Sequence, residues 1–204
     1  MTNLKLSAVI AQAVTVFAFV GCTHAPKFAS PVSKDPAIFV AHTADKPMQS
    51  YLSMNLPYAP YRALREQIEK HEGVELKNRG EAHITVITPI EFDQVLKRKL
   101  SIDKIHNMAA ESNLQDTKYE AICVGKGAKD LDGANEKTYF VVVKSEGLLD
   151  LRTKIQKAFV AAGGPAADFL PENFYPHVTL GYTKRDLHYE DGIRKDDSSC
   201  KYRF

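Results

Sequence analysis

Two segments rich in β-branched and aliphatic residues carry the same His-x-Thr pattern, 94 residues apart. The first, GEAHITVITP, places His83 two residues before Thr85, and the second, FYPHVTLGYT, places His177 two residues before Thr179. Side chains alternate between the two faces of a strand, so each pattern presents one imidazole and one hydroxyl on a single face. We therefore expect two strands, one in each half of the chain, that carry the same pair of polar groups.

The residue types in this pattern suit the chemistry of a phosphodiester. Two imidazoles with pKa values of about 6.5 can act as acid and base at neutral pH. One would deprotonate the attacking group, the other would protonate the leaving oxygen, and the hydroxyls would donate to the non-bridging oxygens. The pattern predicts His83, Thr85, His177 and Thr179 as catalytic residues that require no metal and no other cofactor. The alternative is a polar spot on each of two half-buried strands.

Hydrophobic periodicity predicts the element order β-α-β-α followed by β-β-α-β. The expected strands cover 49–57, 82–88, 118–127, 137–145 and 174–183. The expected helices cover 61–71, 91–112, in one piece or two, and 146–163. The segment 128–136 is expected to be a loop or hairpin end, and the polar tail after Arg185 has no clear pattern. Each half contains a helix and one His-x-Thr strand, which predicts an α+β fold of two lobes around a shared cleft.

The motifs HITV and PHVTLGY resemble the signature of the 2H phosphoesterase superfamily, which includes LigT-like and cyclic phosphodiesterase proteins. The resemblance implies a bilobal, duplicated fold in which two antiparallel sheets surround a central cleft and helices lie outside. It implies a metal-independent hydrolase of 2′,3′-cyclic phosphates or of 2′-5′ linkages in nucleotides and RNA ends. By the same analogy His83 is the general acid and His177 the general base, with the roles exchanged in the reverse reaction.

Three aromatic residues are candidate substrate-binding positions. Tyr175 lies two residues before His177 and would share its face, where it could stack on a base or simply pack. Tyr139 and Phe140 occupy the two faces of one strand, so one of them is expected to line the cleft as a stacking surface, with a core position as the alternative. Tyr182 alternates away from His177 and is expected in the core. The five histidines without a partner pattern are expected to be non-catalytic: His24, His42, His71, His106 and His188.

The N-terminus predicts export. Lys5 precedes an apolar run that is shorter than the roughly 20 residues of a transmembrane helix and is typical of a secretory signal. The run ends in FVGC, which resembles the lipobox of bacterial lipoproteins, although Phe19 stands where Leu is usual. Lipid on Cys22 would anchor the protein to a membrane, in the periplasm or cell envelope. An ordinary signal cleavage or a signal anchor is the alternative.

These features divide the chain into a signal peptide over 1–21, a proline-rich flexible tether over 22–47 and a 2H phosphoesterase domain over 48–204. The run 37–40 within the tether could dock on the domain. In an oxidising compartment Cys123 and Cys200 could pair, or they could remain a buried thiol and a tail thiol.

Bulk charge does not indicate a nucleic-acid-binding protein, because 27 basic and 25 acidic residues leave a net charge of only +2, although local charge around a site could still matter. We expect a monomer whose partner is a nucleotide or short RNA substrate. Two other functions use the same sequence features. The protein could bind a nucleotide or phosphate without turnover, or it could be a structural envelope protein in which the two motifs are accidental.

Overall fold

The computed structural model, which describes residues 26–33, 35 and 37–204, has an α+β fold with two antiparallel sheets. The first sheet pairs β1 (Leu52–Leu56) with β2 (Ala82–Ile87), and the second has the strand order β5-β4-β3-β6. Its strands are β3 (Glu120–Leu131), β4 (Ala134–Lys144), β5 (His177–Tyr182) and β6 (Cys200–Arg203). The predicted fold class, α+β with two antiparallel sheets, is confirmed. Residues 1–25, which contain the expected signal peptide and Cys22, lie outside the described part.

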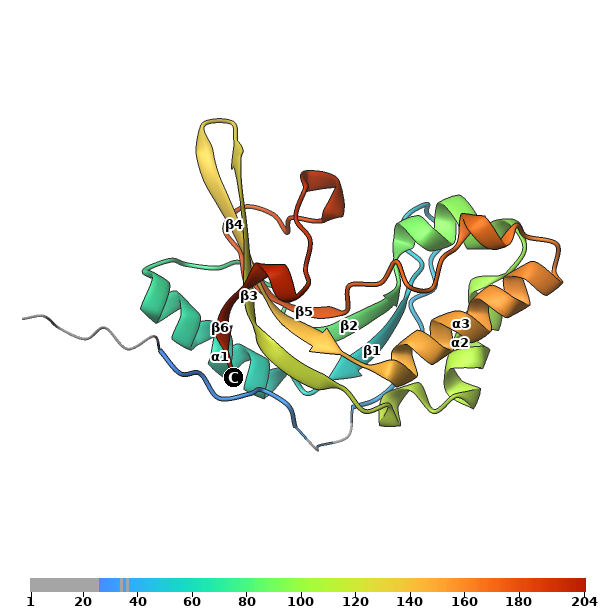
Figure 1. The fold of residues 1–204 in the computed structure, drawn as a ribbon, viewed down its shortest axis with the longest axis horizontal. Coiled ribbons are helices and arrows are strands. Elements are labelled where there is room, and N and C mark those ends of the chain that lie inside the picture. Colours follow the sequence, from blue (N-terminus) through green and yellow to red (C-terminus); the bar gives the residue numbers. More distant parts are fainter. Residues whose placement is uncertain (1–25, 34, 36) are drawn as a thin grey trace, which may run out of the picture.

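In the described part of the chain, three α-helices flank the strands. They are α1 (Tyr58–Glu72), α2 (Ile102–Glu111) and α3 (Glu146–Ala161). Figure 1 shows α1 at one end of the molecule and α2 with α3 at the other, with the strands between. Two of the helices pack on strands from the other half of the chain, since α1 contacts β5 and α3 contacts β2. Each strand that carries a His-x-Thr motif is therefore supported by a helix from the other half.

Short helical turns fill much of the remaining chain. They are η1 (Glu91–Val95), η2 (Leu96–Arg98), η3 (Leu114–Asp116), η4 (Ala166–Asp168), η5 (Tyr189–Asp191) and η6 (Asp197–Ser199). The segment 91–112, expected to be helical in one piece or two, consists of a π turn, a 3-10 turn and, after a short gap, α2. Ser101 begins α2 by accepting a hydrogen bond from the backbone of Lys104, as N-cap serines do. No described helix is long and apolar enough to cross a membrane.

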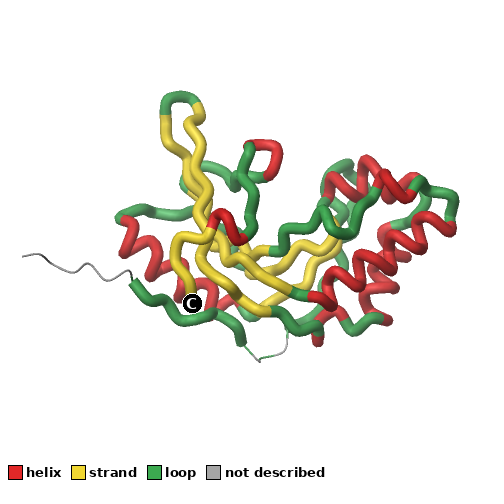
Figure 2. Tube along the Cα trace, in the orientation of Figure 1, coloured by secondary structure: helices red, strands yellow, loops and turns green. Residues whose placement is uncertain are grey.

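The hairpin of β3 and β4 extends through the segment 128–136, which was expected to be a loop or a hairpin end and is the hairpin end. Its strands pair until Leu131 faces Ala134. Asp132 and Gly133 form the turn with φ angles of 51° and 78°, the left-handed conformation that two-residue hairpin turns require. Figure 2 shows the two strands rising beyond the body of the molecule to this turn.

Glu72, at the C-terminal end of α1, ties the helix to the larger sheet. Its carboxylate accepts hydrogen bonds from Tyr139 at 2.8 Å and from Lys126 at 3.0 Å. It also accepts hydrogen bonds from Lys201 and Tyr202 of β6. Burial opposes ionisation, but these four donors hold the pKa of Glu72 well below its usual range. One carboxylate thus joins α1 to β3, β4 and β6.

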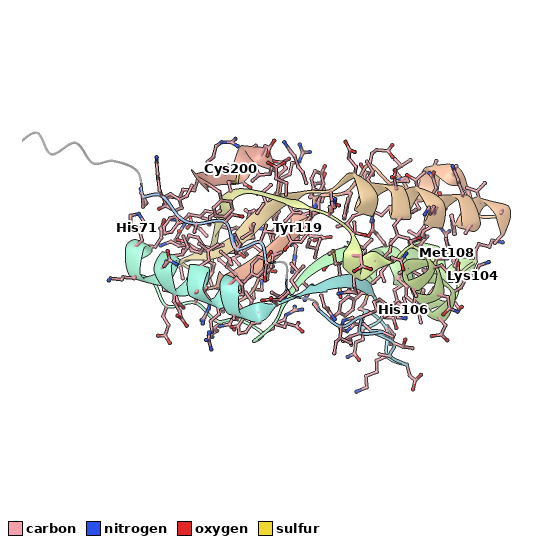
Figure 3. The ribbon with its side chains drawn as sticks, turned by 90° about the horizontal axis from the view of Figure 1, so that it is seen from below. His71, Lys104, His106, Met108, Tyr119 and Cys200 are labelled. Carbon is pink, nitrogen blue, oxygen red and sulfur yellow. A yellow bond between two sulfur atoms is a disulfide. The ribbon has the colours of Figure 1, made fainter. Side chains whose placement is uncertain are left out.

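The described part of the N-terminal segment packs against the domain. Phe28 is only 9% exposed, and its ring lies edge-on to the rings of His71 and Tyr202. Figure 3 labels His71 near the end of α1, close to this segment. Phe28 therefore fastens this part of the expected tether, 22–47, to the domain.

Further along, the run 37–40 is held by polar side chains of the domain. Asn55 donates to the carbonyl oxygen of Ile38 at 2.9 Å, and Gln115 donates to that of Ala37 at 3.0 Å. These bonds place the run beside β1 and η3.

The polar tail returns to the domain as β6, which pairs with β3. A disulfide joins Cys123 of β3 to Cys200 of β6, so the pairing left open by the sequence is present. Figure 3 labels Cys200 at the edge of the larger sheet. The disulfide anchors the segment that follows β5.

Candidate active site

Both His-x-Thr motifs line one cavity of about 670 Å³, a size usual for small-molecule sites. His83 and Thr85 reach it from β2, and His177 and Thr179 reach it from β5. Charged and aromatic side chains complete the wall, among them Arg79, Glu81, Tyr175, Asp186, His188 and Lys195. The structure therefore brings together the four residues that the sequence singled out.

Strand β2 places its motif by simple alternation. Ala82, Ile84 and Val86 are buried in the core, so His83 and Thr85 face the cavity between them. The Nδ1 atom of His83 lies 3.5 Å from a carboxylate oxygen of Glu81. Burial lowers the pKa of His83 below its ordinary value of 6.5, while the negative charge of Glu81 works in the opposite direction.

His177 has a different environment. Its Nδ1 atom lies 2.8 Å from the carbonyl oxygen of Tyr175. A carbonyl oxygen only accepts, so Nδ1 carries the hydrogen and Nε2 carries a lone pair. Burial, reinforced by the positive charge of Lys195, lowers the pKa of His177 to about 3, although Tyr175 and Asp186 oppose the shift. His177 is therefore neutral at neutral pH, with Nε2 as a proton acceptor.

Asp186 accepts hydrogen bonds from several polar groups around the second motif. It accepts hydrogen bonds from Thr179 at 3.0 Å, from Thr138 at 2.6 Å and from Lys195 at 2.9 Å. Burial alone would raise the pKa of Asp186, but Lys195, His188 and Thr138 outweigh it and lower the pKa to about 2. The carboxylate is therefore ionised and serves as a fixed acceptor beside His177.

A β-bulge changes which face of the sheet the last residues of β5 point to. Thr179 pairs with Phe140 and Gly181 pairs with Tyr139, which leaves Leu180 without a partner on β4. The extra residue shifts the alternation by one. Tyr182 consequently lines the cavity, which corrects the expectation that it lies in the core.

A family model described as Swiss Army Knife, 2H phosphoesterase domain, matches residues 50–188, which is more than half of the chain and includes both motifs. The chain belongs to the 2H phosphoesterase family. No curated protein and no solved structure gives a significant match. Membership of this family supports a phosphoesterase activity, which is a hydrolase activity.

The aromatic wall of this 2H phosphoesterase site differs in part from the predicted one. Tyr175 lines the cavity, and its ring is parallel to that of Tyr189, with 6.2 Å between centroids. Arg194 lies over Tyr175, 5.4 Å from the ring centroid. Tyr189 is 62% exposed, so the pair forms the rim of the cavity.

Tyr139 and Phe140 do not line the cavity of this phosphoesterase, which corrects their prediction as substrate-binding residues. Both side chains are fully buried. The Tyr139 hydroxyl donates to Glu72, and the Phe140 ring packs edge-on against His177 with 5.9 Å between centroids. Tyr139 belongs to the main hydrophobic core, and Phe140 belongs to a smaller cluster with Cys123 and Cys200, so β4 is covered on both faces at these two residues.

Most histidines outside the motifs have structural contacts. His106 is buried and its Nε2 atom lies 3.1 Å from the carbonyl oxygen of Tyr51, while His42 stacks on the Tyr51 ring with 4.0 Å between centroids. His188 differs because it lines the cavity, with Nε2 3.8 Å from Asp186. His24 lies outside the described residues.

Sequence reasoning did not find Asp186 or Lys195. Both lie in the irregular segment between β5 and β6, where no hydrophobic period fixes the direction of a side chain. The one available signal was the position of Asp186 close after the second motif. Among the described residues no group of three or more His, Cys, Asp and Glu side chains could hold a metal ion.

Proposed function

We propose that this protein is a metal-independent phosphodiesterase acting on 2′,3′-cyclic phosphates or 2′-5′-linked nucleotides and RNA ends. One observation carries the proposal: a neutral imidazole with a fixed Nε2 acceptor and a second imidazole beside a carboxylate line the same cavity. Environments that separate the proton affinities of two such groups are typical of an acid–base pair.

In the proposed hydrolysis His177 is the general base and His83 the general acid. A water molecule gives a proton to Nε2 of His177 as its oxygen bonds to phosphorus. The bond between phosphorus and one ribose oxygen breaks, and protonated His83 gives its proton to that oxygen. Glu81 supports this role because its charge favours the protonated form of His83.

Two further features support binding of a nucleotide. The hydroxyl of Thr85 faces the cavity and is placed to donate to a non-bridging oxygen. The rim formed by Tyr175 and Tyr189 offers aromatic faces on which a base can stack without sequence preference.

The test is hydrolysis of 2′,3′-cyclic nucleotides and of 2′-5′-linked oligoadenylate in excess EDTA. We expect the wild type to turn over at least one of these substrates and both His83→Ala and His177→Ala to lose activity by more than about 1,000-fold, since each removes one proton transfer. Activity abolished by EDTA would point to a metal enzyme. Tight binding of the same nucleotides without product would point to a binding protein.

We also propose that the protein is exported and anchored by lipid on Cys22. The disulfide between Cys123 and Cys200 supports an oxidising compartment, where such bonds persist. Mass spectrometry of the protein from the membrane fraction of its own host tests this. A mature N-terminus at a lipid-modified Cys22 is the expected result, and an unmodified residue elsewhere would contradict it.

A further inference from the structure

The two His-x-Thr motifs differ in what their hydroxyl groups do. The Thr179 hydroxyl donates to Oδ2 of Asp186 at 3.0 Å, and an ionised carboxylate can only accept. A threonine hydroxyl has one hydrogen, so Thr179 has none left to give to a substrate phosphate. Among the described residues, the hydroxyl of Thr85 makes no comparable bond and faces the cavity.

Lys195 donates to the same carboxylate, Asp186, as the hydroxyl of Thr179. Its side chain is only 3% exposed, yet it lines the cavity that contains both histidines. Its Nζ donates to Oδ1 of Asp186 at 2.9 Å and lies 5.3 Å from the centroid of the Phe140 ring. An ammonium group has three N–H donors, and within the described part of the chain only Asp186 accepts from it. Two donors therefore remain for an acceptor in the cavity.

The negative charge available to Lys195 is also shared. Asp186 accepts from Thr138 and Thr179 as well as from Lys195, so one carboxylate serves three donors. Removing a cation from water is costly unless it is paired and fully hydrogen-bonded. A substrate phosphate would supply both the missing charge and the missing acceptors.

We propose that Lys195 is a catalytic residue that donates to a non-bridging oxygen of the reacting phosphoryl group, in the place where the second motif would otherwise use Thr179. In this arrangement Asp186 holds the ammonium group, and the hydroxyls of Thr138 and Thr179 hold Asp186. All three are positioning residues. The inference rests on the proposed function and assigns the phosphate contact within it. It has a chemical reason, because the transition state of phosphoryl transfer spreads negative charge over the non-bridging oxygens, where a cation stabilises it more than a hydroxyl does.

The kinetic test compares Lys195→Met with Thr179→Val on the substrate that the wild type hydrolyses best. Lys195→Met should lower kcat by about 100- to 1,000-fold, as loss of a transition-state donor does, and Lys195→Arg should recover part of it. Thr179→Val should lower kcat by less than about tenfold, because it removes only a positioning contact. The matched control is Lys184→Met, since Lys184 is an exposed lysine paired with Asp132 away from the cavity wall. Equal or larger loss in Thr179→Val would overturn the assignment.

A second variant tests whether Lys195→Met loses activity only because it is less stable. Lys195→Met leaves Asp186 buried without its cation, whereas Lys195→Met combined with Asp186→Asn removes both charges together. If Lys195 only fastens the tail, the double variant should regain kcat along with its melting temperature. If Lys195 contacts the phosphoryl group, the double variant should regain thermal stability and remain at least about 100-fold slow.

Binding of inorganic phosphate, measured by calorimetry, separates this inference from the proposed function. A wild type that hydrolyses none of the substrates would refute the function. The inference would then still predict that Lys195→Met weakens phosphate binding by at least about tenfold and that Thr179→Val does not. Equal phosphate affinity in wild type and Lys195→Met would overturn the inference whether or not the protein is an enzyme.

Discussion

The Nδ1–H group of His177 donates to the carbonyl oxygen of Tyr175 at 2.8 Å, which leaves the lone pair of Nε2 to take a proton. The backbone of the loop before β5 thus fixes the tautomer. Because the same imidazole is withdrawn from water, it stays neutral at the pH values where most enzymes work. The two histidines of this site are therefore not interchangeable, although their motifs are alike.

The first prediction concerns the dependence of kcat/KM on pH. The base must be deprotonated, so the rate should fall as pH drops through the His177 pKa of about 3. The acid must be protonated, so the rate should fall as pH rises through the His83 pKa, which lies below 6.5. The profile should be bell-shaped with an acidic optimum. A rate that keeps rising through neutral pH would contradict this assignment.

The second prediction isolates Glu81. Its carboxylate lies 3.5 Å from Nδ1 of His83 and raises the pKa of that imidazole. Glu81→Gln should therefore move the alkaline limb of the profile to lower pH and leave the acidic limb in place. Glu111→Gln, an exposed change at the end of α2, should move neither limb. An unchanged alkaline limb in Glu81→Gln would show that His83 is not the acid.

The site illustrates what the sequence could and could not predict. His83 and Thr85 were placed correctly because β2 alternates without interruption. Tyr182 was misplaced because the bulge at Leu180 changes which face of the sheet the next residues occupy, and Gly181, a residue type that often marks a bulge, was the local signal for it. Lys195 could not be found, since its position depends on how the tail folds back onto β5 and β4.

The fold shows the same division between local and long-range information. Helix α1 was predicted from its spacing, and Gly73 ends it with a φ of 62°. The pairing of Cys123 with Cys200 and the placement of β6 beside β3 depend on contacts between residues far apart in the chain. The sequence offered the disulfide only as one of two possibilities, and it carried no pattern that places β6 beside β3.

The third prediction concerns stability. Glu72 accepts four hydrogen bonds, so Glu72→Gln should lower the free energy of unfolding by about 3 kcal/mol at neutral pH. Its folded pKa is depressed, so its contribution is present above its ordinary value of 4.5 and is lost as pH falls further. Urea denaturation should therefore separate wild type from the variant at neutral pH and bring them closer at pH values well below 4.5. Glu66→Gln, on the exposed face of the same helix, should differ little from wild type at either pH.

The fourth prediction concerns the disulfide. It closes a loop with a sequence separation of 77 residues, so its reduction should lower the free energy of unfolding by about 4–5 kcal/mol. Denaturation with and without reductant measures the effect. A variant that combines Cys123→Ala with Cys200→Ala should be as unstable as the reduced wild type and insensitive to reductant. Identical transitions for oxidised and reduced wild type would count against a disulfide that stabilises the fold.

The central claim, that His83 and His177 act together on one phosphodiester, is tested most directly by a double-mutant cycle. The measurement is kcat/KM in EDTA for wild type, His83→Ala, His177→Ala and the double variant. Residues that act as a unit are strongly non-additive, so each single variant should lose about as much activity as the double variant. Single losses that multiply in the double variant, or a single variant that keeps wild-type activity, would contradict the account.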